Sequence, residues 1–157
     1  MISKEVVLVL DNTRSTYNVG SIFRTADGAG VSNIFLVGVT PDPLDRFGRE
    51  RKDIAKVALG AEKTIRWEHA DDIKKLIKKL KKDGFKIVAL EQDKDAMDYK
   101  SFKPNFPLAL VLGEEVKGIS EETLKLCDSI IEIPMAGKKE SLNVSVATGI
   151  ALFRILE

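Results

Sequence analysis

Three short segments of this chain combine charged, polar and small residues directly after predicted strands, as a ligand site requires. The first is Asn18-Val-Gly-Ser-Ile-Phe-Arg24. If a helix begins near Asn18, its small residues and its arginine share one face, where a ligand can approach the backbone beside a phosphate-binding guanidinium. The residues expected on that face are Gly20, Ser21, Arg24, Thr25 and Gly28. The alternative is a surface arginine on an ordinary helix, which the periodicity alone favours.

The second segment is Leu112-Gly-Glu-Glu-Val-Lys-Gly118. Two glycines five residues apart around a pair of glutamates indicate a tight turn whose peptide groups face a ligand. The segment lacks the Gly-Lys-Ser/Thr ending of a phosphate loop, and its carboxylates would repel a polyphosphate. The chain also has no Gly-x-Gly-x-x-Gly sequence, so ATP, NAD and FAD are disfavoured. The alternative is a turn before a helix whose acidic start faces solvent and favours the helix dipole.

The third segment spans residues 131–145, where a predicted strand ends at Pro134 and a loop containing Gly137 follows. Proline and glycine predict an irregular backbone whose peptide groups can bond a ligand. Either Ser141 or Asn143 caps the final helix. Capping accounts for one of these two polar residues and leaves the other free for a site.

Apolar runs predict the strands that position these segments. The runs are apolar at consecutive positions, which is typical of strands covered by helices on both faces. The helical spacing of residues 73–80 predicts an amphipathic helix, Ser120 precedes another, and residues 143–156 are apolar nearly all round, which predicts a buried helix. We therefore expect an α/β fold with a mostly parallel sheet flanked by helices. The predicted strands are Val6–Leu10, Ile34–Val39, Lys86–Leu90, Leu108–Leu112 and Ser129–Ile133.

Length and composition narrow the class of protein. The 157 residues suit a single domain, residues 1–157, without a separate RNA-binding domain. A formal net charge of +1 excludes an overtly basic nucleic-acid-coating protein. The single Cys127 and single His69 exclude an internal disulfide and the usual zinc ligand sets, so we expect no metal and no catalytic role for either residue. No apolar run approaches a membrane span and no signal peptide is visible, so we expect a cytoplasmic protein.

Taken together, the three segments resemble the three motifs of the SpoU (TrmH) family of RNA ribose 2′-O-methyltransferases, within the SPOUT superfamily. The order of the segments, their placement after strands and the sequence Ser141-Leu-Asn-Val-Ser145 carry the resemblance, which covers essentially the whole chain. The resemblance implies an S-adenosylmethionine-dependent enzyme with a C-terminal trefoil knot from Leu108 onward. It also implies a homodimer in which each active site is shared between subunits.

The resemblance implies roles for individual residues. Arg24 is the expected catalytic arginine, and Asn18, Glu115, Ser141 and Asn143 complete the expected catalytic set. Glu115 matches the glutamate of the family pattern Gly-x-Glu-x-x-Gly. Backbone groups around five residues are expected to hold the cofactor: Leu90, Gly113, Ile133, Met135 and Leu142.

The implied partner is RNA, either tRNA or rRNA. The segment 56–62 is similar to a segment of tRNA-modifying members, which slightly favours tRNA. Because the net charge is near zero, RNA phosphates must meet local basic clusters. We expect these contacts in residues 41–56, interpreted as a functional loop or lid, whereas the lysine-rich helix at 73–82 is interpreted as a solvated face. The alternative for 41–56 is a solvated excursion with a short helix. The expected phosphate-binding residues are Arg46, Arg49, Arg51 and Lys52.

Two other functions remain open at this point. The chain could be an RNA-binding module that keeps the fold without catalysis, although every expected motif residue is present. It could also be a nucleotide-binding regulatory domain that uses no RNA. Binding of S-adenosylmethionine distinguishes the methyltransferase from both.

Overall fold

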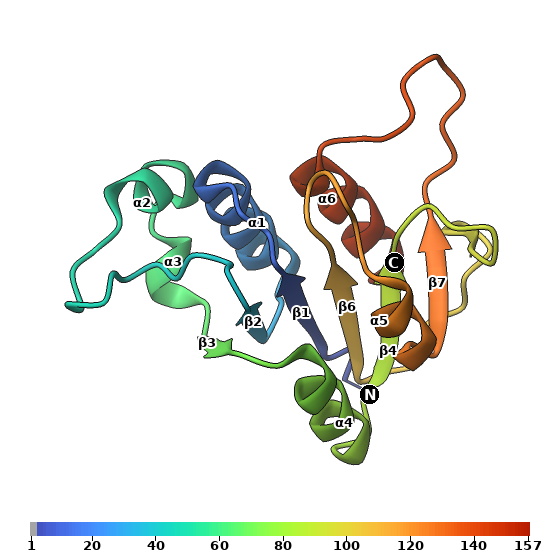
Figure 1. Ribbon diagram of the computed structural model, residues 1–157, viewed down its shortest axis with the longest axis horizontal. Helices are drawn as coiled ribbons and strands as arrows, with labels where there is room; N and C mark the ends of the chain where they lie inside the picture. Colours follow the sequence, from blue (N-terminus) through green and yellow to red (C-terminus); the bar gives the residue numbers. More distant parts are fainter. Residues whose placement is uncertain (1–2) are drawn as a thin grey trace.

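The computed structural model of this protein describes residues 3–157 and contains a seven-stranded sheet (Figure 1). The strand order is β3-β2-β1-β6-β4-β7-β5, and all neighbouring strands run parallel. The carboxyl ends of the strands therefore open on one edge of the sheet. The strands are β1 (Val6–Asp11), β2 (Asn33–Val37), β3 (Trp67–Ala70), β4 (Lys86–Leu90), β5 (Met97–Asp98), β6 (Leu108–Leu112) and β7 (Ser129–Glu132).

Helices cover both faces of this sheet, and each face has its own apolar core. Side chains alternate along a strand, so Leu8 and Leu10 of β1 join one core while Val7 and Val9 join the other. The first core contains residues of α1 (Thr16–Ala29), α2 (Lys52–Ala58), α3 (Ala61–Thr64) and α6 (Val144–Ile155). The second contains residues of α4 (Ile73–Lys82), with α5 (Glu121–Leu126) packed against it. The expected α/β architecture is confirmed.

The strands predicted from apolar runs are present, whereas β3 and β5 were not predicted. Both lie at the edges of the sheet. Strand β3 has the sequence Trp-Glu-His-Ala and is only partly buried, and β5 has two exposed residues. An edge strand needs no continuous apolar run, because solvent covers part of it.

Helix α1 begins at Thr16, two residues before the expected start at Asn18. The reason is the Ser15 side chain, whose oxygen accepts a hydrogen bond from the Asn18 backbone N–H at 3.1 Å and so caps the helix. This earlier start makes Asn18 a buried residue of the first turn.

The expectation that the small residues of α1 share a face open to a ligand is wrong. Gly20 is buried against α2, and a Cβ atom at this position would lie 2.8 Å from the Ile54 carbonyl oxygen. Thr25 instead faces α6, with its methyl group 3.5 Å from where a Cβ of Gly149 would lie. Gly20 and Thr25 therefore allow α1 to pack closely against two neighbouring helices, whereas Gly28 stays exposed.

Helix α6 is not buried on all sides, contrary to the expectation from its apolar sequence. Ala151, Leu152 and Ile155 pack into the core, because α6 lies beside α1 on one face of the sheet (Figure 1). Val146 and Phe153, on the opposite side of the helix, are about half exposed, at 50% and 53%. The helix therefore presents an apolar stripe to its surroundings.

Residues 41–56 form a loop followed by the start of a short helix. Residues 41–51 form a loop that projects from the carboxyl end of β2, and α2 begins at Lys52 (Figure 1).

Candidate active site

A pocket of about 290 Å³ lies at the carboxyl ends of β4, β6 and β7. Its wall is formed by the ends of these strands, by the loop 113–118 after β6, and by residues that precede and begin α6. This is the edge at which ligands bind in open parallel sheets. All five residues expected around a cofactor line this one pocket: Leu90, Gly113, Ile133, Met135 and Leu142.

Loop 113–118 folds back on itself beside the pocket. The backbones of Glu114 and Gly118 pair, with N···O distances of 2.9 and 3.3 Å. Gly118 has a φ of 68°, and a Cβ on Gly113 would lie 2.5 Å from the Gly118 carbonyl carbon. Two glycines are therefore required for the turn to close.

Glu91 anchors this loop and was not singled out from the sequence. Its carboxylate accepts hydrogen bonds from the backbone N–H groups of Ile119, at 2.7 Å, and Gln92, at 2.9 Å. The available signal was an acidic residue immediately after a buried strand. That signal does not reveal a partner 28 residues away in the chain.

Glu115 connects the loop after β6 to the start of α1. Its carboxylate accepts hydrogen bonds from the backbone N–H groups of Arg14 (3.3 Å) and Ser15 (3.1 Å) and from the Asn18 side-chain amide (3.4 Å). Burial raises the pKa of Glu115, but these hydrogen bonds outweigh it and hold the pKa below its ordinary value. Glu115 is thus an ionised group that fixes the first motif against the second.

Asn143 connects the third motif to the same cluster. Its side-chain N–H donates to the side-chain amide oxygen, Oδ1, of Asn18 at 3.1 Å. Its own carbonyl oxygen accepts from the Ser145 backbone N–H at 2.8 Å and so caps α6. Asn18 therefore donates to Glu115 and accepts from Asn143, which joins three motifs in one hydrogen-bonded chain. We call Glu115, Asn18, Asn143 and Ser145 the polar relay.

The structure places the other two expected catalytic residues outside this relay. Ser141 lines the pocket, while Asn143 rather than Ser141 caps α6. Arg24 is exposed on α1, six residues beyond Asn18 and therefore about 9 Å further along the helix axis. The guanidinium of Arg24 is thus available to a group that approaches from outside this chain.

The pocket is apolar and acidic at once. Leu90, Leu112, Ile133 and Val144 supply aliphatic walls. The charged residues in its lining are Glu91, Glu114, Glu115, Glu132, Glu140 and a single lysine, Lys117. This excess of carboxylates favours a ligand that is partly apolar and carries positive charge.

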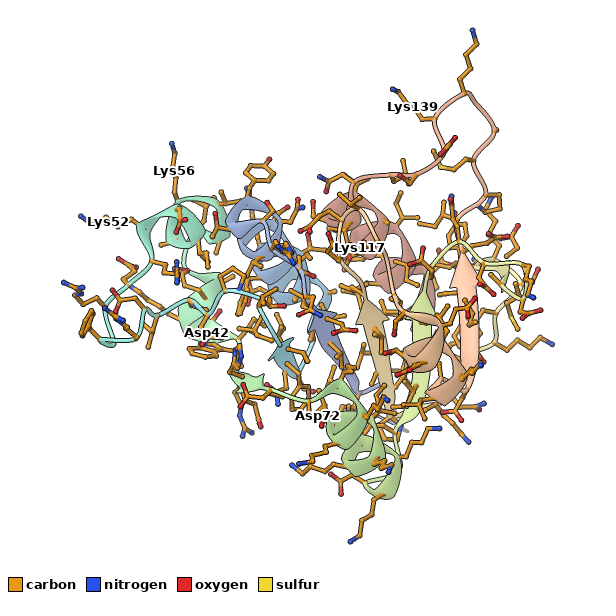
Figure 2. The ribbon with its side chains drawn as sticks, in the orientation of Figure 1. Asp42, Lys52, Lys56, Asp72, Lys117 and Lys139 are labelled. Carbon is orange, nitrogen blue, oxygen red and sulfur yellow. The ribbon has the colours of Figure 1, made fainter. Side chains whose placement is uncertain are left out.

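The basic residues expected to contact RNA belong to the loop after β2 and to α2, which lie on the other side of α1 from β4, β6 and β7 (Figure 1), the strands whose ends line the pocket. Arg46 and Arg49 are exposed in the loop after β2, Lys52 is exposed at the start of α2, and Arg51 is partly buried. Figure 2 shows further lysines on the side toward which the strands point: Lys52 and Lys56 on α2, Lys117 after β6 and Lys139 after β7. The positive charge on this side is therefore spread over several loops.

Within residues 3–157, no group of three or more His, Cys, Asp and Glu side chains is arranged to hold a metal ion. No helix in this part of the chain is both long and apolar enough to cross a membrane. Cys127 is partly buried, and burial raises the pKa of its thiol to about 11.

A parallel sheet with a pocket at its carboxyl edge defines the class of α/β ligand-binding folds. The chain belongs to the SpoU rRNA Methylase family, whose model matches residues 5–153.

Among its relatives is the 23S rRNA (guanosine-2′-O-)-methyltransferase RlmB of Pectobacterium atrosepticum, 39% identical over 147 residues. The match covers 94% of this chain and 57% of that protein. The RlmB protein of Escherichia coli is 37% identical over 147 residues, with 94% and 58% covered. The chain therefore spans less than two thirds of the length of these relatives.

Solved structures agree with this assignment. The AdoMet-bound rRNA methyltransferase of Sinorhizobium meliloti superimposes with a TM-score of 0.87 at 32% identity, covering 98% of this chain and 56% of that one. The TrmH/SpoU tRNA modifying enzyme of A. aeolicus gives a TM-score of 0.84 at 30% identity, covering 98% and 75%.

Proposed function

We propose that this protein is an S-adenosylmethionine-dependent methyltransferase that modifies the ribose 2′-hydroxyl of rRNA. The observation that carries the proposal is that residues of the second and third motifs line one pocket together with all five expected cofactor residues. The first motif is hydrogen-bonded to both of these motifs through Asn18. Membership of the SpoU family and the similarity to named RNA 2′-O-methyltransferases support it.

The residues of the pocket fit S-adenosylmethionine. Its adenine suits the aliphatic side chains of Leu90, Ile133 and Leu142, and its sulfonium and ammonium groups suit an excess of carboxylates. Loop 113–118 offers peptide groups at close range, because Gly113 and Gly118 place no side chain there. When bound, the cofactor would supply a methyl group on a positively charged sulfur. A nucleophile that attacks the methyl carbon takes this group, and the sulfur leaves as a neutral thioether.

The chain's own residues position the reacting groups. The polar relay fixes the start of α1 to the loop after β6 and to the start of α6, so the parts of the site are held in register before RNA binds. The proposed role of Arg24 is to bind and polarise the target nucleotide through its planar guanidinium group. This role fits its exposed position on α1.

For the substrate, the relatives favour rRNA and not the tRNA that residues 56–62 suggested. The curated relatives described above are named as 23S rRNA methyltransferases. The basic residues around Arg46 and Lys52, together with Lys117 and Lys139, are proposed to contact RNA phosphates. An RNA substrate also supports the expected cytoplasmic location.

We also infer a homodimer and the C-terminal trefoil knot. The exposed stripe on α6, formed by Val146, Ile150 and Phe153, supports a dimer because it presents three apolar side chains at helical spacing. A partner on this stripe would remove these three side chains from water. The order of the strands in the sheet supports the knot. Strand β6 lies between β1 and β4, both of which precede it in the chain, and after β7 the chain returns to place α6 beside α1.

The two alternative functions receive less support. A module without catalysis would not need a pocket lined by all five expected cofactor residues. A regulatory domain for anionic nucleotides would not need an acidic pocket.

Calorimetry with S-adenosylmethionine tests the cofactor part of this proposal. The wild type should bind, and Leu142→Arg should bind more weakly because a large charged side chain then occupies the pocket wall. Leu59→Arg is the matched control, since it places the same group at an exposed leucine directly after α2, where binding should be unchanged. Absence of binding by the wild type, or full binding by Leu142→Arg, would contradict the proposal.

A further inference from the structure

The loop after β2 is held at its base by contacts to the body of the protein. The Nδ1 atom of His69 on β3 lies 2.6 Å from a carboxylate oxygen of Asp42. The Arg51 backbone N–H donates to the Pro43 carbonyl oxygen at 2.9 Å, which closes the two ends of the loop against each other. The loop therefore leaves the sheet from a fixed base (Figure 2, where Asp42 is labelled).

The outer part of the loop, residues 44–50, is also a built turn, which we call the tip. The Asp45 carboxylate accepts hydrogen bonds from the backbone N–H groups of Phe47, at 2.8 Å, and Arg49, at 2.9 Å, and from the Arg49 guanidinium at 3.1 Å. Leu44 and Glu50 pair as an antiparallel bridge, and the Asp45 backbone N–H donates to the Arg49 carbonyl at 2.8 Å. The tip thus holds one conformation without help from the core.

This turn displays an aromatic ring between charged groups. Phe47 is 65% exposed and contributes nothing to either apolar core. The guanidinium carbons of Arg46 and Arg49 lie 4.7 and 4.8 Å from the centre of its ring. A turn held by its own hydrogen bonds that presents an exposed phenylalanine beside two guanidinium groups suits a ligand with both a flat apolar face and negative charge.

We propose that the tip is a stacking platform for an unpaired nucleobase of the RNA substrate, formed by the Phe47 ring and the guanidinium planes that lie over it, with Arg46 as the phosphate contact. This inference rests on the proposed function, because it assumes an RNA substrate. Unpaired bases stack on aromatic rings and guanidinium planes, whereas the bases of a closed duplex are not available. The tip and the pocket lie on opposite sides of α1 (Figure 1), so the platform grips RNA away from the methylated ribose. It selects RNA in which an unpaired nucleotide reaches the tip while the methylated ribose lies at the pocket.

The test compares two RNA probes of equal length: a hairpin with an unpaired loop and a blunt duplex. Phe47→Ala should weaken hairpin binding by about fivefold or more, as removal of base stacking does in other proteins, and leave duplex binding unchanged. Phe47→Trp should bind the hairpin as the wild type does. Leu44→Ala, which removes another exposed apolar side chain from the same tip, is the matched control and should change neither affinity.

Salt dependence separates stacking from charge. Phe47→Ala should leave the slope of log affinity against log salt unchanged, whereas Arg46→Gln should reduce it, because only the arginine neutralises phosphate. Three results for Phe47→Ala would overturn the platform. They are a hairpin affinity equal to that of the wild type, an equal loss of affinity for hairpin and duplex, and altered sedimentation of the protein with unaltered RNA binding. Failure of the wild type to bind either RNA would overturn the RNA-directed function as well.

Discussion

The Asn143 side-chain N–H donates to the side-chain amide oxygen of Asn18 at 3.1 Å, although the two residues are 125 positions apart in the chain. Each asparagine stands at or near the first turn of a helix, α6 and α1 respectively. The same Asn18 amide donates to Glu115 at 3.4 Å. One buried side chain therefore holds the three motif segments together.

Replacement of Asn18 by alanine removes both bonds at once. Asn18→Ala should lower the free energy of unfolding by about 1–3 kcal/mol, because Glu115 and Asn143 each lose a partner. Methyl transfer should fall as well, since the motifs are no longer held in register. Asn105→Ala, at an exposed asparagine, is the control and should shift stability by less than about 0.5 kcal/mol. Urea denaturation of both variants measures the difference, and equal losses would show that Asn18 has no special role.

The charge of Glu115 predicts a pH dependence of stability. The folded-state pKa of Glu115 is lowered below the ordinary 4.5, so its contribution is fully present above pH 4.5 and is lost as pH falls through the lowered value. The wild type should therefore be more stable than Glu115→Gln at neutral pH, and the gap should narrow on acidification below pH 4.5. Denaturation across this range measures the gap. Glu114→Gln is the control, because the bonds to the start of α1 go to Glu115. A gap independent of pH would refute the ionic role.

Two glycines of α1 should respond in opposite directions to alanine. At Gly20 a Cβ would lie 2.8 Å from the Ile54 carbonyl oxygen, so Gly20→Ala should destabilise the protein by about 1–3 kcal/mol. At Gly28 nothing lies within 4 Å of the added atom, so Gly28→Ala should stabilise by roughly 0.5–1 kcal/mol. Thermal unfolding of the pair compares the same chemical change in one helix. Stabilisation by Gly20→Ala would contradict close packing of α1 on α2.

The apolar stripe on α6 predicts an oligomeric state. Ile150→Asp introduces a charge in the middle of the stripe and should convert a dimer to a monomer in sedimentation velocity. Leu44→Asp introduces the same charge at an exposed leucine on the loop after β2 and should leave the dimer intact. A wild type that sediments as a monomer would exclude the proposed dimer.

The interior of this fold was predictable because buried parallel strands require continuous apolar runs. Leu108–Leu112 and Lys86–Leu90 are strands with the predicted bounds. The edge strand Trp67–Ala70 was missed, since it is held by backbone pairing to β2 and has exposed side chains. The role of Gly20 was also misjudged. A glycine that lets a ligand approach the backbone and a glycine that lets a second helix pack closely give the same sequence pattern. Only the tertiary packing distinguishes them.

The candidate site was predictable in its members but not in its connections. Resemblance to a family identified Glu115 and Asn143, but no sequence spacing indicates that Asn18 bonds to both. Glu91 escaped notice for the same reason, because its partner at Ile119 is brought near only by the fold. Long-range hydrogen bonds leave no local pattern, whereas strands and helices do.

Transfer of an isotopically labelled methyl group tests the central claim most directly. The protein would be incubated with methyl-labelled S-adenosylmethionine and with 23S rRNA transcribed in vitro, which carries no ribose methylation. Mass spectrometry of the digested nucleosides would then locate the label. The proposed function predicts label in a 2′-O-methyl ribose with the wild type and a marked loss with Arg24→Lys, which keeps the charge but not the planar guanidinium. Label on a base would contradict the proposed chemistry, and full transfer by Arg24→Lys would contradict the role of Arg24. No transfer by the wild type would contradict the function itself.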